Sequence, residues 1–150
     1  MRTFTSAAEV EAAAGDHLGE SAWRTITQEQ VNLFADATDD HQWIHVDPQR
    51  ATAGPFGATI AHGYLSLSLL AAFSKEIIAV EDVRMSINYG LDRVRFLTPV
   101  TVGSRVRSSA DLLTVTPTEA GLRIAVRHTV EIEGEAKPAL VADSLALQVW

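Results

Sequence analysis

The spacing of hydrophobic residues changes once along the chain, from helical spacing in the first half to alternation in the second. Capping signals followed by apolar residues at helical spacing predict helices over about 7–14 and 28–37. In the second half, apolar and polar residues alternate, which is typical of strands with one buried face. Helices followed by a run of antiparallel strands predict the α+β class.

The most hydrophobic helix is predicted to begin near Gly63. From Tyr64 to Val80, apolar residues occupy nearly every direction around a helix, which is typical of a helix buried on most sides. The same segment contains serines, a lysine and a glutamate, which argues against a membrane span. We therefore expect a central helix over about 62–80 in the interior of the fold.

The second half of the chain predicts long strands. The alternation is clearest from Leu122 to Ile132, where apolar residues occupy every second position but one. Several of these strands exceed the usual length of about five or six residues, so we expect a curved sheet wrapped around the central helix. The other predicted strands cover 85–89, 93–97, 105–115 and 141–149, and Gly90 separates the first two.

Composition narrows the functional classes. The 150 residues contain no repeat and no long linker, which predicts a single domain over 1–150. With no cysteine, catalysis must come from carboxylates, histidines, hydroxyls or backbone groups. The net charge of -7 argues against a nucleic-acid partner. The first residues lack the apolar core of a secretory signal, so we expect a cytoplasmic protein with no membrane partner.

The first candidate site lies between two predicted helices. Asp40 and His45 are separated by five positions, and Asp47-Pro48 is a strong start for the next helix, so the intervening segment is predicted to be a loop. A carboxylic acid and an imidazole close together can hold a water molecule, one group accepting a proton while the other gives one. This chemistry suits the addition or removal of water across a double bond. Alternatively, Asp40 caps a turn and His45 packs over the core.

The second candidate is Gly63, at the mouth of the central helix. A glycine there lets a ligand approach backbone amides that have no intrahelical partner, and the helix dipole favours negative charge at this end. Such an amide can stabilise a carbonyl oxygen that gains enolate character. The alternative is that Gly63 only permits close packing.

Together, these segments resemble a known motif. It comprises Asp40-His41-Gln42-Trp43-Ile44-His45-Val46-Asp47-Pro48 followed by Phe56-Gly57-Ala58-Thr59-Ile60-Ala61-His62-Gly63. This combination resembles the hydratase motif of the MaoC-like dehydratases, the R-specific enoyl-CoA hydratases of the hotdog fold. With the later segment 88–96 and Pro99, the chain looks most similar to the NodN-like branch.

The resemblance implies a hotdog fold and a reversible, cofactor-free syn hydration of trans-2-enoyl thioesters to R-3-hydroxyacyl thioesters. It implies an acyl-CoA or acyl-carrier-protein substrate, with coenzyme A present only as part of that substrate, and a homodimer whose sheets join edge to edge. Carried over to this chain, Asp40 and His45 are the acid/base pair and the Gly63 amide is the oxyanion donor. Which of the pair is acid and which is base stays open.

Three further positions bear on this motif. Gln42 and Trp43 stand where many relatives have asparagine and proline, so Gln42 is a candidate for polar support of the aspartate. Relatives can also carry a serine on the central helix facing the aspartate, and the matching position is Ala71 here. These differences keep a non-catalytic acyl-thioester binding module open as an alternative, beside a hotdog thioesterase.

The remaining candidates have supporting roles. We expect His62 to make a structural hydrogen bond, the alternative being that it orients the loop or the substrate. Asn88 and Arg93 are candidates for lining the pocket or contacting coenzyme A, although Arg93 is equally well explained as a solvated strand arginine. We expect no metal, because no third ligand has a natural place beside Asp40 and His45.

Overall fold

The computed structural model describes residues 1–150 and is built around one curved, six-stranded sheet. The strands are arranged in the order β2-β6-β7-β8-β5, and β3 pairs with β6 beside β2. All of these pairings are antiparallel. The bounds are β2 (His17–Glu20), β3 (Arg24–Thr25), β5 (Met85–Phe96), β6 (Arg105–Thr118), β7 (Gly121–Ile132) and β8 (Leu140–Val149).

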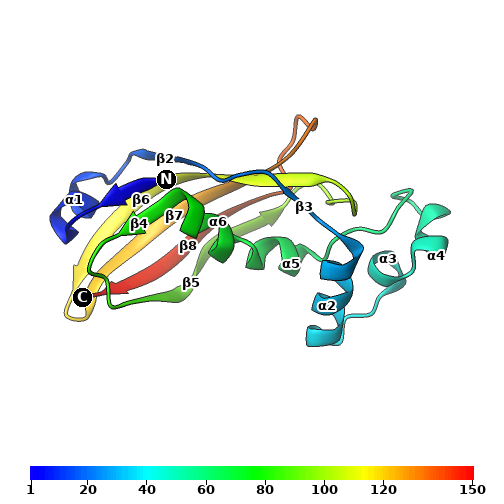
Figure 1. The fold of residues 1–150 in the computed structure, drawn as a ribbon, viewed down its shortest axis with the longest axis horizontal. Coiled ribbons are helices and arrows are strands. Elements are labelled where there is room, and N and C mark those ends of the chain that lie inside the picture. Colours follow the sequence, from blue (N-terminus) through cyan, green and yellow to red (C-terminus); the bar gives the residue numbers. More distant parts are fainter.

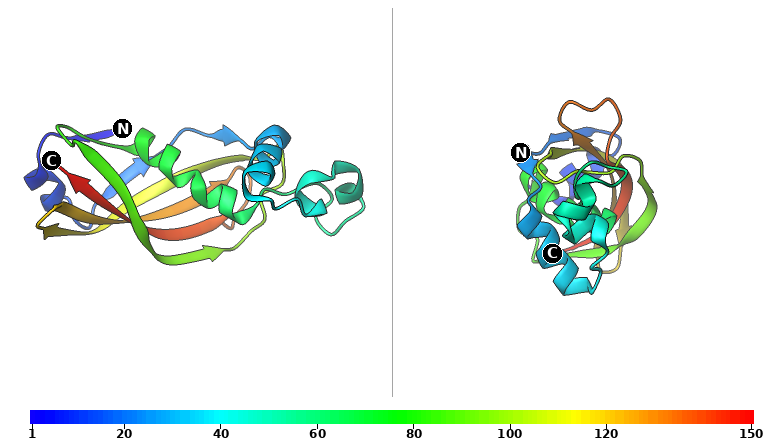
Figure 2. Two further views of the ribbon diagram at one scale, coloured as in Figure 1. Left: turned by 90° about the horizontal axis from the view of Figure 1, so that it is seen from below. Right: turned by 90° about the vertical axis from the view of Figure 1, so that its right-hand side faces the viewer.

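Two helices, α5 (Gly63–Ser68) and α6 (Leu70–Ile77), run one after the other across one face of this sheet (Figure 1). A second group of helices projects beyond one end of the sheet, while both chain termini lie at the other end (Figure 2). This projecting group contains α2 (Gln28–Thr38), α3 (Trp43–Val46) and α4 (Pro48–Thr52), and α1 (Ala7–Ala12) lies near the termini. None of the helices combines the length and the hydrophobicity that a bilayer span requires.

The predicted capping signals set the starts of the projecting helices. At α2, the Thr27 hydroxyl accepts from the Gln30 amide (3.2 Å) and the Gln30 side chain accepts from the Thr27 amide (3.0 Å), which completes a capping box. At α4, the Asp47 carboxylate accepts from the Arg50 amide (3.0 Å), and Pro48 occupies the first turn. Both helix starts expected from the sequence are therefore confirmed.

The central helix is present, but it is shorter than the predicted 62–80. It ends at Ile77, and Ile78–Val80 form strand β4, which pairs in parallel with β1 (Arg2–Phe4). Leu69 keeps a helical backbone between α5 and α6, with φ -66° and ψ -16°, so the two segments follow one path. The prediction failed at 78–80 because a short apolar run fits a helix and a strand equally well.

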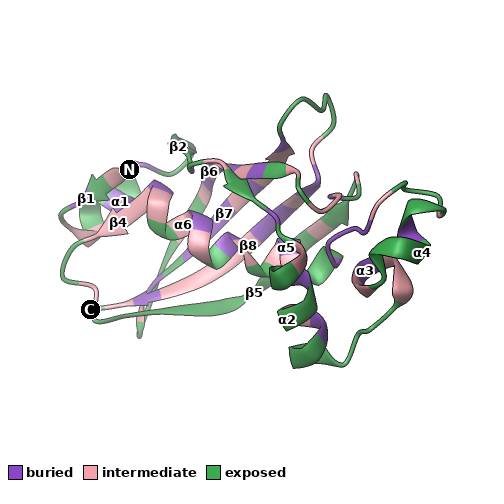
Figure 3. Ribbon diagram, turned by 45° about the vertical axis from the view of Figure 1, so that its right-hand side comes forward, coloured by how far each residue is buried: buried purple, intermediate pink, exposed green.

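The central helix is buried along one face only. Ser66, Leu70, Phe73 and Ile77 are buried, whereas Tyr64 is 69% exposed (Figure 3). The expectation of a helix buried on most sides is wrong for a single chain, because only one side of the helix faces the sheet. The buried face joins two hydrophobic clusters, with Phe73 in one and Ile77 in the other.

The long strands are confirmed, with one correction at Gly90. The predicted strands 85–89 and 93–97 form one strand, β5, whose pairing with β8 is irregular between Asn88 and Gly90 and again between Leu91 and Arg93. A bulge absorbs an extra residue without ending a strand, so Gly90 interrupts the register and not the strand. Strand β6 also continues to Thr118, beyond its predicted end at 115.

His128 on β7 is the most buried histidine, at 1% exposure, and burial lowers its pKa to about 4. The unfolded chain binds this proton near pH 6.5, so between pH 6.5 and 4 only the unfolded state is protonated at this site. The contribution of His128 to stability is therefore present above pH 6.5 and is lost as the pH decreases from 6.5 toward 4. The loss is about 2 kcal/mol at pH 5.

We predict that His128→Phe lowers the stability difference between pH 7 and pH 5 by about this amount, measured by urea unfolding at both pH values. His41→Gln serves as the control, because His41 is exposed and its pKa is raised by the neighbouring Asp36 carboxylate. A stability difference between pH 7 and pH 5 that is as large in His128→Phe as in the native protein would contradict this assignment.

Candidate active site

His45 lies on α3, a single helical turn where the sequence predicted a loop. Its side chain is 7% exposed, and its Nδ1 lies 2.7 Å from the backbone carbonyl oxygen of Ile60. A carbonyl can only accept, so Nδ1 carries the hydrogen and the neutral ring has its lone pair at Nε2. His45 is therefore oriented as a proton acceptor.

Gln28, which the sequence did not single out, holds the backbone of this turn. Its side-chain amide donates to the His45 carbonyl oxygen (2.7 Å), and its side-chain oxygen accepts from the Thr59 hydroxyl (2.5 Å). Thr59 is buried, and Gln28 lies at the start of α2. The pair links α2, α3 and the segment before α5, which restricts where His45 can lie.

His62 contacts both halves of the predicted acid/base pair. Its Nε2 lies 2.9 Å from the backbone oxygen of Asp40, so the expected structural hydrogen bond is present. Its ring stacks on that of His45, with centroids 3.9 Å apart and planes inclined by 25°. His62 is 2% exposed, and its Nδ1 is buried with no hydrogen-bond partner. The same side chain thus fixes the main chain at Asp40 and packs against the His45 ring.

The Asp40 carboxylate lies beside the two imidazoles, with its side chain half exposed. One oxygen of Asp40 and one nitrogen each of His45 and His62 lie within 4.8 Å of one another. Polar groups this close can share a hydrogen-bonded water molecule. The three residues are also the only group of this kind that could approach a common ion. The expectation that no third ligand lies beside Asp40 and His45 is therefore wrong, because the fold brings His62 there from the start of the central helix. One nitrogen of each histidine donates to a carbonyl oxygen, and the absence of a metal stays a prediction.

His45 and Gly63 line the same cavity, which has a volume of about 440 Å³. Gly63 is the first residue of α5, and no side chain caps the amides at this helix start. A Cβ atom at Gly63 would lie 3.1 Å from the ring of Phe96, which also lines the cavity. Glycine therefore allows the Phe96 ring to lie directly against the backbone here. The buried Ser66, which the sequence did not predict, lines the same cavity.

Asp40 and His62 lie beside His45 but do not line this cavity, and neither do the other predicted residues. Gln42 is exposed at the start of α3 and makes no side-chain capping bond. Asn88 and Arg93 are exposed on β5; Asn88 lines a different cavity and Arg93 lines neither. Ala71 is exposed, so Ser66, and not residue 71, is the helix position that faces the His45 cavity.

Burial lowers the pKa of His45 below its ordinary value, and the neighbouring His62 lowers it further. The Ile60 carbonyl and the Asp40 carboxylate act in the opposite direction. The net result keeps the imidazole neutral at neutral pH, so that its Nε2 lone pair is available to accept a proton.

The family model of the MaoC-like domain matches residues 9–133. The chain belongs to the MaoC-like dehydratase family. The 3-hydroxyacyl-thioester dehydratase Z of Mycobacterium tuberculosis (strain H37Rv) is 57% identical over 150 residues, covering 99% of both chains. Nodulation protein N of Rhizobium meliloti is 49% identical over 145 residues, covering 95% of this chain and 90% of that relative. The resemblance to the NodN-like branch is thus confirmed.

Solved structures of the family share the fold. The unliganded R-hydratase PhaJ1 from Pseudomonas aeruginosa has a TM-score of 0.75 at 23% identity, covering 91% of this chain and 81% of that one. A protein from Archaeoglobus fulgius described as a monoamine oxidase regulatory protein has a TM-score of 0.78 at 24% identity, covering 99% and 97%. The predicted α+β hotdog fold is confirmed. The MaoC-like chain is a hydro-lyase, which confirms the predicted enzyme class.

We predict that His45 titrates below pH 6.5 in a histidine-detected NMR titration, because burial disfavours its charged form. Asp40→Asn lowers this pKa further, since it removes a charge that favours the imidazolium. Asp39→Asn is the matched control: Asp39 raises the pKa of His41 and does not act on His45. A His45 pKa above 6.5 would rule out the burial argument.

Proposed function

We propose that this MaoC-like protein adds water reversibly and R-specifically to trans-2-enoyl thioesters. One observation carries the proposal: His45, an imidazole with a free lone pair, lines one cavity with Gly63, the first residue of a helix, and the Asp40 carboxylate lies beside that imidazole. Among the relatives, the one at 57% identity is named for 3-hydroxyacyl thioesters, the hydrated form of such a substrate.

The proposed reaction uses the Asp40–His45 pair to bind the water. His45 Nε2 accepts a proton from the water as its oxygen forms a bond to C3 of the substrate. The C2=C3 electron pair moves toward the thioester oxygen, and a proton from the same pair of residues then bonds to C2 on the same face. The protein returns to its starting protonation state, and the reverse sequence removes water.

The Gly63 amide is proposed to hold the thioester oxygen as it gains enolate character. Its position at the uncapped start of α5 supports this role, because amides at a helix start lack an intrahelical partner. His62 is proposed as a positioning residue, since it bonds the Asp40 backbone and stacks on the His45 ring. No step requires a bound cofactor, and coenzyme A or an acyl carrier protein serves only to carry the acyl group.

We predict that the purified protein hydrates crotonyl-CoA, followed by loss of the conjugated enoyl absorbance. Asp40→Asn and His45→Gln each lower kcat by roughly a hundredfold to ten-thousandfold, because each removes a proton-transfer group. Both variants are expected to keep the circular dichroism spectrum of the native protein.

Asp39→Asn and His41→Gln are the matched controls, since both residues are exposed neighbours in the same segment. They should retain nearly full activity. Unchanged turnover in both Asp40→Asn and His45→Gln would contradict the proposed proton-transfer roles of these residues. Release of free thiol without a hydroxyacyl product would instead identify a thioesterase, and saturable binding without turnover would identify a binding module.

We further propose that two copies of the chain pair through β5. This strand is 12 residues long, forms one edge of the sheet and exposes apolar side chains, with Tyr89 60% and Leu91 47% exposed (Figure 3). A long apolar edge strand has unpaired backbone N–H and C=O groups that can pair with another strand. In a two-fold symmetric dimer, that strand is β5 of the second copy.

Light scattering on the purified protein is expected to give a dimeric or larger mass. Replacing both Tyr89 and Leu91 by lysine should yield monomers, because charges would be buried at the paired edge. Leu33→Lys is the control, since Leu33 is 63% exposed on α2, away from this edge. A monomeric native protein would contradict the proposal.

A further inference from the structure

Ser66, on α5, carries a polar side chain that the reaction described above does not use. It is 6% exposed and lines the His45 cavity together with Gly63, which stands three positions earlier on the same helix. Only three residues of the cavity lining have polar side chains, and these are His45, Ser66 and Thr98. The rest of the lining is mainly apolar, so the Ser66 hydroxyl has few polar groups around it.

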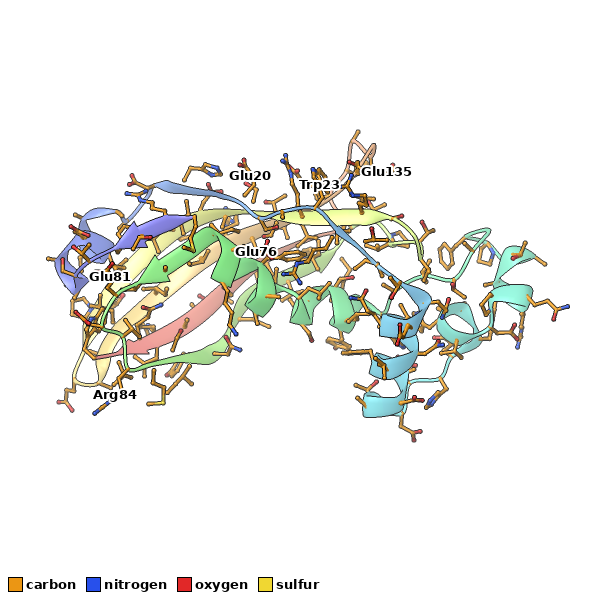
Figure 4. All side chains as sticks on the ribbon, in the orientation of Figure 1. Glu20, Trp23, Glu76, Glu81, Arg84 and Glu135 are labelled. Atoms are coloured by element: carbon orange, nitrogen blue, oxygen red, sulfur yellow. The ribbon has the colours of Figure 1, made fainter.

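The Ser66 hydroxyl makes no hydrogen bond within the chain. A serine inside a helix usually points to solvent or donates to the carbonyl four residues earlier. Two other polar side chains of the central helix have such partners. The Ser68 hydroxyl donates to the Tyr64 carbonyl (2.7 Å), and the Glu76 carboxylate, labelled in Figure 4, accepts from the Ala22 amide (3.0 Å). Ser66 is therefore a buried polar side chain whose donor is free.

Helix geometry directs the Ser66 side chain toward Gly63. The Cα–Cβ bonds of an α-helix tilt toward its N-terminus, so each side chain lies over the preceding turn. Residues three positions apart lie on the same face of the helix, about 5–6 Å from each other. The Gly63 amide also has no hydrogen-bond partner in the chain. One atom of a ligand in the cavity can thus lie within reach of both groups.

The two free groups select the kind of atom that can pair with them. A backbone amide only donates, so an atom shared by the Gly63 amide and the Ser66 hydroxyl must be an acceptor. Burying a hydroxyl without a hydrogen bond is unfavourable, and an acceptor that reaches it therefore gains binding energy. Donors in an apolar cavity stabilise negative charge more strongly than donors in water. An oxygen that gains negative charge during a reaction suits this position.

We propose that Ser66 is a further catalytic residue, whose hydroxyl donates a hydrogen bond to the thioester oxygen beside the Gly63 amide. This inference rests on the proposed hydratase function and completes its oxyanion site. The hydroxyl keeps its proton throughout. Its hydrogen bond strengthens as the C2=C3 electron pair moves toward the thioester oxygen and weakens again when C2 receives a proton. The contribution of Ser66 therefore falls on the transition state more than on substrate binding.

Ser66→Ala removes the donor while keeping a small side chain and a good helix former. We expect kcat for crotonyl-CoA to fall roughly a hundredfold, which is the usual cost of removing one donor to an oxyanion. KM should change by less than about twofold, because the lost hydrogen bond is made mainly in the transition state. If the native protein hydrates crotonyl-CoA and Ser66→Ala has the same kcat, the role of Ser66 is wrong and the hydratase function stands.

Ser68→Ala is the matched control, because it makes the same chemical change two positions further along the helix. The Ser68 side chain is exposed and does not line the cavity, so its loss should leave kcat and KM unchanged. A decrease in kcat as large as that of Ser66→Ala would trace the effect to the helix instead of the hydroxyl donor, and would overturn the proposal.

The absorption spectrum of a bound thioester tests the hydrogen bond without turnover. trans,trans-2,4-Hexadienoyl-CoA absorbs at longer wavelength when its carbonyl oxygen accepts stronger hydrogen bonds, because excitation moves electron density onto that oxygen. We expect this shift to longer wavelength when the thioester binds to Asp40→Asn, which lacks a proton-transfer group. Adding Ser66→Ala to this variant should reduce the shift, whereas adding Ser68→Ala should not.

The spectrum separates the two proposals. If the native protein does not hydrate crotonyl-CoA, the hydratase function fails, while the bound spectra still show whether Ser66 donates to the carbonyl oxygen. A shift that decreases only with Ser66→Ala would support the hydrogen bond whatever the turnover. Equal shifts with and without Ser66→Ala, or no shift in any variant, would overturn it.

Discussion

Because a backbone carbonyl accepts hydrogen bonds and never donates them, the 2.7 Å contact between His45 Nδ1 and the Ile60 oxygen decides which ring nitrogen can take up a proton. A second hydrogen bond joins α3 to the segment before α5, because the Ile60 amide donates to the Ile44 carbonyl (3.0 Å). The chemistry of the imidazole thus depends on the position of one backbone group. A side-chain partner could rotate away, whereas this carbonyl can move only with the chain.

The segment that supplies this carbonyl is hydrogen-bonded to the connection between β5 and β6. Ala61 donates to the Val100 carbonyl (2.8 Å), and Val102 donates to the Thr59 carbonyl (2.8 Å). The next residues are His62, which bonds the Asp40 backbone, and Gly63, which starts the central helix. One short stretch of chain therefore orients the His45 ring, bonds the Asp40 backbone and begins the central helix at Gly63, which lines the His45 cavity.

Local signals in the sequence predicted what local physics determines. The capping box at Thr27 and the alternation along β7 were sufficient for those elements. The strand at Ile78–Val80 depends on pairing with β1, a contact that no local pattern encodes. The same holds in the site: the spacing of Asp40 and His45 is visible in the sequence, but the bond from Gln28 to His45 joins residues 17 positions apart. Such support can be identified only once the fold is known.

Two buried histidines, His45 and His128, differ in the group that stands beside the ring. Burial lowers the pKa of both rings and keeps each imidazole neutral, and each Nδ1 lies within hydrogen-bond distance of an oxygen. His45 lies beside the Asp40 carboxylate, which can exchange protons with it through water. His128 faces the Ser74 hydroxyl, which ionises too weakly to take part in proton transfer and can only form hydrogen bonds. The neighbour of the ring, and not the ring itself, therefore determines whether a buried imidazole of this fold has a group with which it can exchange protons.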